Sequence, residues 1–582
     1  MATFTIPNQR RIKQDNLGDY GGELFSTYNI DLISNKGKIL TSKKLSKIYD
    51  AVTDFSSATT FSDLLVWDGA YYALTEDDLW KNLDLAGGWS LVSGGDSSVF
   101  ATMCVFDGEL RIVDTTDIRR YTGSGSIVDN WWTSTLSGTA LTSGVPHITA
   151  VVQSQKETFY VTDGSVVRYY EKGAASTQNV QLKSGVVSCA LAPALDGSMW
   201  VGTFNENEEN AYVYQIYTNE QVDGTTVYRQ AYQVDGVAVL GMWVKDNTPY
   251  IVTEKGAIQE FNGVGFTTIN RFPFSFGSRH ISGVIPGLIQ DSNRARPIHP
   301  RGVKLVRDVA FININTDTTT DGFAINSRTH SGVWTFDHTT NELTHYLSYA
   351  ELDTDNGSFS LQESAPIVVT DSSDTEVWIA GSPSFAGGVT NAGLYVFGTE
   401  YATGMFVTSE ITAETVTEAN DAVYHKATLY DDASIYTLYR TTKRDTLRWE
   451  ANWTGAHTFV TTSDLSNLAV GDLILVSHEY ASGAWSVVTG IDSSSTTYTV
   501  EVYHDIGAVG ETSQIFSDNF KLIGFDTDTL VYDARNTFTS ADGELKALSP
   551  NITAGWIQYM VILEGRVEYR QFIAHGTAKN VV

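Results

Sequence analysis

The stretch LLVWDGAYYALTEDDLWK, Leu64–Lys81, contains three short runs of apolar and aromatic residues separated by two polar turns. The first turn is Asp68-Gly69, a pair that accepts the left-handed backbone of a tight hairpin. The second turn is Glu76-Asp77. Runs of this length, rich in Val, Leu, Tyr and Trp, are typical of β-strands. The stretch therefore predicts three consecutive antiparallel strands.

The same arrangement of strand, turn and strand recurs along the chain. MCVFDGELRIVDTTDIRRYTG, Met103–Gly123, is the clearest further copy. Most intervals between turns are about 40–50 residues, the length of one four-stranded propeller blade. We therefore expect a β-propeller of about seven blades over residues 61–400. Its turns are expected near Asp68, Asp107, Lys156, Asp196, Asp246, Asp321 and Asp374.

The composition agrees with an all-β protein. Aromatic residues are abundant, with 29 Tyr, 26 Phe and 13 Trp, while 49 Gly supply turns and only 11 Pro interrupt strand pairing. No apolar run reaches the roughly 18–20 residues of a membrane helix, and Met1–Asp19 lack the apolar stretch of a signal peptide. Neither a membrane span nor a signal is expected. Cys104 and Cys189 are expected to be buried thiols.

Beyond residue 400 the blade spacing ends, and two further units are expected. Residues 401–454 and 502–582 predict a β-sandwich. Residues 455–501 predict a small inserted β-barrel, with adjacent ends and few contacts with its host. Residues 1–60 are expected to hold a basic arm, ring-closing strands and a short helix. The ring-closing strands are assigned to YNIDLISNKGKIL, and the helix to the spacing of Leu45, Ile48, Tyr49 and Val52.

The formal net charge of −30 is unevenly distributed. Residues 1–50 carry eight basic and five acidic side chains, a balance of +3, which leaves −33 on the rest of the chain. Such a body disfavours binding along a nucleic-acid backbone, whose phosphates need clustered cations. The basic arm suits an acidic neighbour, such as another copy of the chain, and a solvated arm is the alternative. The interface residues predicted in the arm are Arg10, Arg11 and Lys13.

A second basic segment lies in the widest interval between predicted turns. Three of its arginines are stiffened by Pro297 and Pro300, and the segment is too long for a blade turn, so we expect a projecting loop. Long basic loops on acidic proteins are commonly contact elements, and a solvated loop or a ligand site are the alternatives. The interface residues predicted here are Arg294, Arg296 and Arg301.

The strong catalytic and metal-binding motifs are absent from the sequence. There is no GxSxG elbow, no CxxC pair, no phosphate-binding loop and no HExxH motif, so we expect no enzyme, no catalytic residues, no metal site and no cofactor. Three weaker patterns each have an ordinary structural explanation as the alternative. His330, His338 and His345 are more often surface residues than ligands, and Asn313–Gly322 lacks a known calcium spacing. Trp131-Trp132 is more often blade core than a sugar-stacking pair.

DGSMWVGT, Asp196–Thr203, looks like the turn-and-tryptophan signature of sensor-type propellers and, more loosely, like the aspartate boxes of sialidases. A sialidase also needs arginines that converge on one carboxylate. The candidates for that set are scattered through the propeller, so a propeller hydrolase is kept only as a minor alternative. These candidates are Arg111, Arg168, Arg279 and Arg328.

Taken together, the layout resembles β-propeller-bearing virion structural proteins of tailed bacteriophages, of the tail nozzle, hub or adaptor-associated type. GGELFSTYNIDLISNKGKIL runs directly into the blades, TGMFVTSEITAETVTEANDAVYHKATLY leads into the sandwich, and the chain ends on WIQYMVILEG and its partner strand. The middle segment is similar to a phage pattern in which an aromatic-Thr-Ser strand precedes a lysine-bearing strand. The residues concerned are Phe406, Thr408, Ser409 and Lys426.

The resemblance implies a non-enzymatic virion protein of the phage tail, made in the host cytoplasm. Its implied partners are further copies in a ring, with a hexamer as one candidate, and neighbouring tail proteins. A negatively charged lumen would repel phosphates, so contact with translocating DNA would be passive. A receptor- or glycan-binding virion protein is the alternative function.

Overall fold

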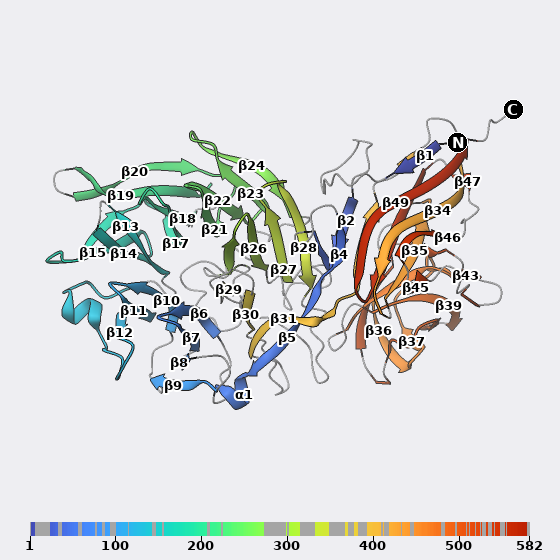
Figure 1. The fold of residues 1–582 in the computed structure, drawn as a ribbon, viewed down its shortest axis with the longest axis horizontal. Helices are drawn as coiled ribbons and strands as arrows, with labels where there is room; N and C mark the ends of the chain where they lie inside the picture. Colours follow the sequence, from blue (N-terminus) through green and yellow to red (C-terminus); the bar gives the residue numbers. More distant parts are fainter. Residues whose placement is uncertain are drawn as a thin grey trace.

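The computed structural model consists almost entirely of β-strands (Figure 1). Helical structure in the described residues amounts to one α-helix, α1 (Ala51–Asp54), and one π-helix, η1 (Trp131–Thr135). No helix in this described part is long and apolar enough to cross a membrane. The structure describes residues 2–578 except 6–23, 33–37, 56–60, 76–77, 84–87, 94–99, 115, 143–146, 154–155, 206–209, 223–224, 273–297, 299–301, 315–331, 349–366, 370–376, 382–392, 409–410, 413–417, 432, 443–446, 479–483, 495–496, 508, 511, 518, 524, 527–530, 533–537, 540–541, 548–552 and 555.

The first three sheets of the propeller are built from strands that follow one another in the chain. The first turn is Asp68-Gly69, and both residues have the positive φ expected of a tight hairpin. The strands are β6 (Phe61–Trp67), β7 (Ala70–Thr75), β8 (Leu79–Asn82) and β9 (Ser90–Ser93); β10 (Phe100–Phe106), β11 (Glu109–Asp114) and β12 (Ile118–Tyr121); β13 (Ile148–Gln153), β14 (Lys156–Asp163), β15 (Val166–Glu171) and β16 (Gln178–Gln181).

The next three sheets repeat this arrangement with four strands each. They comprise β17 (Val186–Pro193), β18 (Met199–Asn205), β19 (Tyr212–Val222) and β20 (Thr225–Gln233); β21 (Val239–Lys245), β22 (Thr248–Thr253), β23 (Ala257–Phe261) and β24 (Phe266–Arg271); β25 (Val303–Val306), β26 (Val309–Ile314), β27 (Gly332–Asp337) and β28 (Glu342–Ser348).

The seventh sheet closes the ring with a strand from the start of the chain. Its order is β29 (Ile367–Val369), β30 (Val377–Gly381), β31 (Gly393–Tyr401) and β5 (Lys43–Asp50). The first strand of each sheet contacts that of the next, and β29 contacts β6, so the described sheets form a closed circle. This arrangement is a β-propeller, as the sequence predicted. Closure leaves no first strand without a neighbour.

Three hydrogen bonds link adjacent blades through their first strands or, at His147, through the residue just before one. The amide of Met103 donates to Asp63 Oδ2 at 2.8 Å, and the amide of Ile148 donates to Thr102 Oγ1 at 3.2 Å. The amide of Leu191 donates to His147 Nδ1 at 3.0 Å. At the same place, the pairing of first and second strands shifts by one residue in four blades, which indicates a repeated β-bulge.

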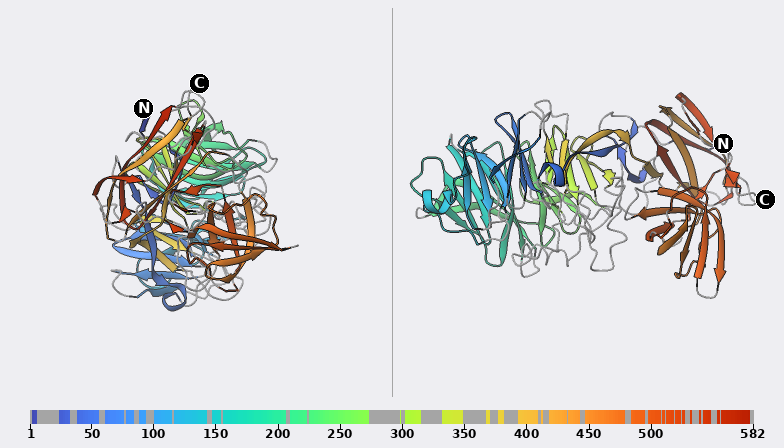
Figure 2. Two further views of the ribbon diagram at one scale, coloured as in Figure 1. Left: turned by 90° about the vertical axis from the view of Figure 1, so that its right-hand side faces the viewer. Right: turned by 90° about the horizontal axis from the view of Figure 1, so that it is seen from below.

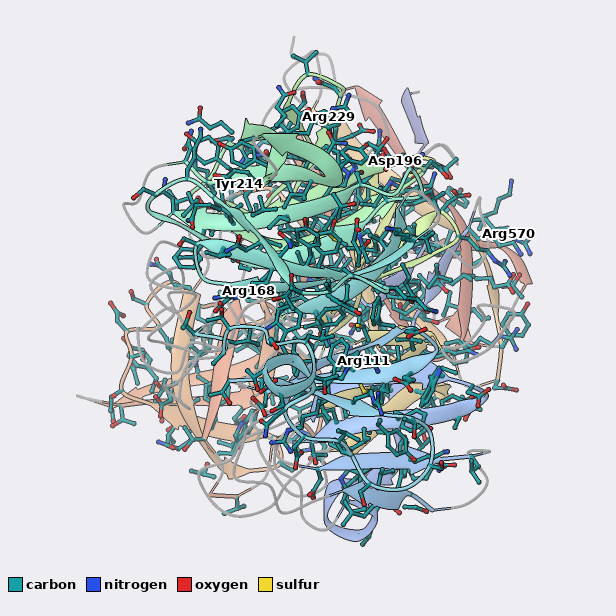
Figure 3. The ribbon with its side chains drawn as sticks, turned by 90° about the vertical axis from the view of Figure 1, so that its left-hand side faces the viewer. Arg111, Arg168, Asp196, Tyr214, Arg229 and Arg570 are labelled. Carbon is teal, nitrogen blue, oxygen red and sulfur yellow. The ribbon has the colours of Figure 1, made fainter. Side chains whose placement is uncertain are left out.

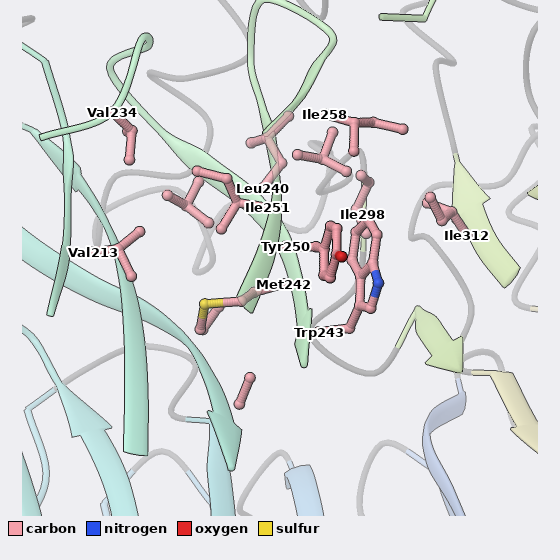
Figure 4. Packing of buried hydrophobic residues seen from close by; sticks show 14 of the residues in the cluster. Val213, Val234, Leu240, Met242, Trp243, Tyr250, Ile251, Ile258, Ile298 and Ile312 are labelled. Carbon is pink, nitrogen blue, oxygen red and sulfur yellow. The ribbon is translucent and has the colours of Figure 1, made fainter. Parts of the chain in front are cut away.

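The blade cores are packed with aliphatic and aromatic side chains. Figure 4 shows part of one such cluster, in which the ring of Trp243 of β21 stacks on that of Tyr250 of β22; Val213 of β19 and Ile258 of β23 belong to the same cluster. Ile298 of the connection between β24 and β25 is fully buried in the same cluster. A Cβ at Gly241 would lie 3.1 Å from Ile298, so the fit is close. At this residue the connection is anchored in the core, while residues 273–297 and 299–301 of the expected projecting loop lie outside the described residues.

Three assignments near the propeller were wrong. The closing strand is β5, whereas YNIDLISNKGKIL contributes β3 (Ile30–Asp31) and β4 (Ile39–Thr41) to the sandwich. The helix expected from Leu45 to Val52 is instead most of β5, followed by the four residues of α1. The sixth blade turn is Arg307-Asp308 between β25 and β26, not Asp321, which lies outside the described residues.

The sandwich consists of two large sheets. Buried side chains from both sheets, including Phe406, Val423, Val561 and Tyr569, form one shared core. One sheet combines β3, β4, β49 (Val567–Ala578), β34 (Glu418–Leu429) and β46 (Asp542–Ala547), with β1 (Ala2–Thr5) and β47 (Thr553–Ala554). The other combines β2 (Leu24–Tyr28), β32 (Gly404–Thr408), β48 (Trp556–Glu564), β35 (Ser434–Arg440) and β42 (Lys521–Leu522), with β33 (Ile411–Thr412) and β45 (Phe538–Thr539).

A six-stranded closed barrel is inserted into the sandwich, but it is wider than the predicted residues 455–501, because Leu447–Gly455 and Thr512–Ser517 also form strands of the barrel. Its ends are adjacent, because Leu447 pairs with Ser517. The barrel contacts its host more than expected, since Trp485 and Val487 share a cluster with Met405 and Met560 of the sandwich. In order, its strands are β36 (Leu447–Gly455), β37 (Thr458–Thr461), β40 (Thr497–Val502), β39 (Ala484–Ser494), β38 (Leu473–His478) and β41 (Thr512–Ser517). A short pair, β43 (Phe525–Asp526) and β44 (Val531–Tyr532), follows.

Two chain segments run side by side from the sandwich into the propeller, where β5 and β31 pair (Figure 1). The amide of Ser42 donates to the carbonyl of Asn29, and the amide of Ala402 donates to the carbonyl of Ser42. Asn29 Nδ2 donates to the carbonyl of Thr403 at 3.0 Å. Asn29, Ser42 and Ala402 are completely buried. We call these residues the joint; it ties the two bodies into the elongated shape seen in Figure 2.

Candidate functional site

The six interface residues predicted from the sequence lie outside the described residues. These are Arg10, Arg11, Lys13, Arg294, Arg296 and Arg301. Of the same basic segment, Lys304 lies on β25, and Arg307 occupies the following turn with a φ of 54°. The interface prediction therefore stays a prediction.

The two described arginines of the sialidase alternative do not converge. Arg111 on β11 is 2% exposed, pairs with Glu109 at 3.0 Å and lies 4.2 Å from the Trp131 ring centre. Burial lowers the pKa of its guanidinium, and the Glu109 pair opposes that shift. Arg168 on β15 pairs with Asp163 at 2.6 Å. Figure 3 shows Arg111 and Arg168 on different blades. Arg279 and Arg328 lie outside the described residues.

Asp196 organises a turn. Its Oδ1 accepts hydrogen bonds from the amide and hydroxyl of Ser198, and its Oδ2 accepts one from Tyr217 at 2.7 Å. Burial raises the pKa of this carboxyl, but the hydrogen bonds outweigh it and the pKa is lowered overall. An acceptor satisfied on both oxygens by the local turn is typical of structural aspartates.

The two described histidines and the tryptophan pair pack against core side chains. His338 Nε2 accepts from Trp243 Nε1 at 3.0 Å, and burial lowers the pKa of His338 to about 4. His345 is buried beside Trp334, while His330 lies outside the described residues. Within the described part of the chain, no group of three or more His, Cys, Asp or Glu is placed to hold a metal. Trp131 and Trp132 are 4% and 0% exposed, so this pair cannot stack on a sugar.

The remaining sequence expectations have mixed outcomes. Cys104 and Cys189 are buried thiols, as predicted. Of the calcium-like stretch Asn313–Gly322, only Asn313 and Ile314 are described, and both are buried on β26.

An open recess of about 490 Å³ lies beside the joint, and no sequence motif predicted it. The propeller side supplies Lys43 of β5 together with Thr399 and Tyr401 of β31. The sandwich side supplies the turn after β34 and the turn between β48 and β49. The lining residues on that side are Tyr430, Asp431, Ala433, Gly565 and Arg566. No single segment carries enough of the lining to form a motif.

The turn between β48 and β49, which lines the recess, is held by the side chain of Thr41. Thr41 Oγ1 donates to the carbonyl of Gly565 at 2.8 Å, and the amide of Val567 donates to Thr41 Oγ1. Gly565 has a φ of 71°, and a Cβ there would lie 3.0 Å from the Cα of Ala433. A side chain at residue 565 would therefore collide with the neighbouring turn. The two turns hold each other in one position.

One wall of the recess carries a charged and aromatic cluster. Tyr430 donates to Glu568 Oε1 at 3.0 Å, and Lys38 pairs with Glu568 Oε2 at 2.5 Å. The hydrogen bonds from Lys38 lower the pKa of Glu568, with burial acting against them. The Arg566 guanidinium lies 4.2 Å from the centre of the Tyr430 ring. The face of Tyr430 is thus occupied by a cation.

Comparison with known proteins finds β-propeller structures but no matching protein family. No protein-family model matches the chain, and no curated protein matches it. Among solved structures, YCF48 bound to D1 peptide aligns with a TM-score of 0.37 and 10% identity, covering 64% of this chain and 98% of that one. The Neurospora crassa Pan2 WD40 domain aligns with a TM-score of 0.37 and 8% identity, covering 62% and 96%. The propeller domain of Doa1 aligns with a TM-score of 0.35 and 9% identity, covering 61% and 98%.

Proposed function

We propose that this chain is a non-enzymatic structural subunit of a tailed-phage virion, a tail nozzle or hub component. In this proposal, copies of the chain assemble in a ring around or at the end of the DNA channel and contact neighbouring tail proteins. The proposal joins the resemblance of the sequence to a single structural observation, the joint between propeller and sandwich.

The joint supports a building-block role because it couples the two bodies through paired backbone. Domains connected by one linker move relative to each other by default. Here two segments cross together, and Asn29, Ser42 and Ala402 are hydrogen-bonded and completely buried. The strands β2 and β3 of the sandwich also contact β28 of the propeller. In a subunit of this kind the propeller and the sandwich keep a fixed relative position, with no hinge between them.

Within this proposal, Arg10, Arg11, Lys13, Arg294, Arg296 and Arg301 contact acidic surfaces of neighbouring subunits. Opposite potentials speed encounter and fix orientation, while exposed ion pairs contribute about 0–1 kcal/mol each. Most of the affinity then comes from buried contacts. Assembly is therefore expected to weaken with salt without being abolished.

The test is incorporation into particles. We expect purified virions to contain the chain in a fixed copy number by quantitative mass spectrometry, and a triple Arg294→Glu, Arg296→Glu, Arg301→Glu variant to be incorporated more slowly. The melting temperature of the isolated variant should stay close to that of the parent. Virions that lack the chain would overturn the proposed function. Normal incorporation of the triple variant would remove only these arginines from the interface.

A further inference from the structure

The recess beside the joint has an excess of positive charge on a strongly acidic protein. Lys43 and Arg566 line it, with Asp431 as the one carboxylate among its lining residues. Neither Lys43 nor Arg566 has an ion-pair partner among the described residues, although the whole chain carries 68 acidic side chains and 38 basic ones. Glu568 nearby is already paired with Lys38. Two cations against one carboxylate give the lining a net charge of +1.

Arg566 is held in a form suited to binding a carboxylate. Its guanidinium lies over the Tyr430 ring, and the Tyr430 hydroxyl is fixed by Glu568. The amide of Tyr430 also donates to the carbonyl of Arg566, so the two residues are tied by their backbones. A guanidinium stacked on an aromatic face keeps its N–H edge for planar acceptors, which it binds with two parallel hydrogen bonds. Its side chain therefore loses little freedom on binding.

We propose that this recess binds an acidic segment of a neighbouring copy of the chain, with one Asp or Glu carboxylate held by Arg566 and Lys43. This inference rests on the proposed function, which places copies of the chain side by side. Charge complementarity selects the occupant, because the body outside residues 1–50 carries −33 and offers many carboxylates. A sugar cannot stack on the face of the Tyr430 ring that Arg566 covers.

The first experiment measures binding of a fluorescent peptide of alternating Asp and Gly to the full chain by anisotropy, at low salt. Arg566→Glu is compared with Arg229→Glu, a matched control: the Arg229 guanidinium also lies over a tyrosine ring, 5.4 Å from the centre of Tyr217, but on the propeller (Figure 3). We expect Arg566→Glu to weaken binding at least tenfold and Arg229→Glu to change it less than twofold. Arg566→Lys should fall between, because it keeps the charge and loses the paired hydrogen bonds.

Three outcomes would overturn the inference: no peptide binding by the parent chain, an equal loss in both charge reversals, or binding of citrate or inorganic phosphate without binding of the peptide. The last outcome would identify a small-anion site. Arg566 is exposed, so its variants should keep the melting temperature of the parent, which is measured alongside.

The second experiment separates this inference from the proposed function. Sedimentation velocity at one protein concentration should show less self-association for Arg566→Glu than for Arg229→Glu, and virion content is measured independently. If virions contain the chain but Arg566→Glu changes neither peptide binding nor self-association, the proposed binding site in the recess is overturned and the proposed function stands. If peptide binding depends on Arg566 but virions lack the chain, the recess remains a binding site and the proposed function is overturned.

Discussion

In the propeller, six of the seven described sheets consist of strands that follow one another in the chain, whereas each large sheet of the sandwich combines strands from both ends. The propeller core is therefore built from local hairpins, stacked around a ring. The sandwich core needs Ile30 and Ile39 from the amino-terminal region beside Val561 and Tyr569 from the carboxy-terminal region. The two bodies should differ in how they depend on the amino terminus.

The largest expected effect comes from two truncations, which test separately how the sandwich and the propeller depend on the amino-terminal residues. Removal of residues 1–42 deletes β1 to β4 and should abolish the cooperative unfolding of the sandwich while the propeller still melts. Removal of residues 1–50 also deletes β5, so the seventh blade loses the strand that closes it, and both transitions should be lost. Differential scanning calorimetry, with mass spectrometry of proteolytic fragments, distinguishes the cases. A native sandwich transition after removal of residues 1–42 would contradict this reading.

The next effect concerns the polar centre of the sandwich. His425 is fully buried, with Nδ1 at 2.6 Å from the Tyr569 hydroxyl and Nε2 at 2.7 Å from Thr437 Oγ1. His425→Ala should destabilise the sandwich by about 3–5 kcal/mol, because it leaves a cavity and two buried hydroxyls without this partner. Chemical denaturation measures the change. The control is His457→Ala on the exposed surface of the barrel, for which a loss above about 1 kcal/mol would be unexpected.

The same contrast explains what the sequence predicted correctly. The turns Asp68-Gly69, Asp107-Gly108 and Asp246-Asn247 join neighbouring strands, and each of these residues has the positive φ that the residue pairs favour. Local chemistry is sufficient there. The sandwich sheets, in contrast, pair β4 with β49 and β2 with β32 across hundreds of residues. No local signal specifies such partners, so only the sheet class could be predicted.

The wrong helix has a specific cause. In β5, Tyr49 pairs with Leu394 and Lys47 with Tyr395, so Ile48 is an extra residue in the pairing. This bulge interrupts the alternation of a strand and places apolar residues at a spacing that imitates a helix. The recess was missed for another reason. Its lining comes from residues 43, 399, 401, 430, 431, 433, 565 and 566, which only the joint brings together.

Acid should destabilise both bodies through buried histidines. Burial lowers the pKa of His425 to about 3 and that of His338 to about 4. The unfolded chain binds protons at a pKa near 6.5, so the stability contributed by a neutral buried histidine is complete above that pH and is lost as the pH falls toward the folded value. Between pH 7.5 and 5 we expect a loss of about 2 kcal/mol per histidine.

The two histidines separate the two bodies in this experiment. His425→Gln should flatten the pH dependence of the sandwich transition, and His338→Gln that of the propeller transition, because a neutral amide binds no proton. Calorimetric melts at pH 7.5 and 5 give the slopes. Carboxylates titrate in the same range, so the comparison is between each variant and the parent. An equal pH dependence of the melting transition in the parent and the variants would show that protonation of these two rings does not destabilise the fold.

The smallest effect tests whether the aspartate-box resemblance at Asp196 is structural. Asp196→Ala removes the acceptor for Ser198 and Tyr217, all within blade four and its turn. That turn lies partly in solvent, so water can accept the hydrogen bonds that Ser198 and Tyr217 donate to Asp196. The expected loss of stability is therefore about 1 kcal/mol in the propeller transition and none in the sandwich. Asp196→Asn should recover part of it, since an amide oxygen still accepts from Ser198. Loss of the whole propeller transition in Asp196→Ala would mean that this single turn specifies the ring, contrary to a closure distributed over all blades.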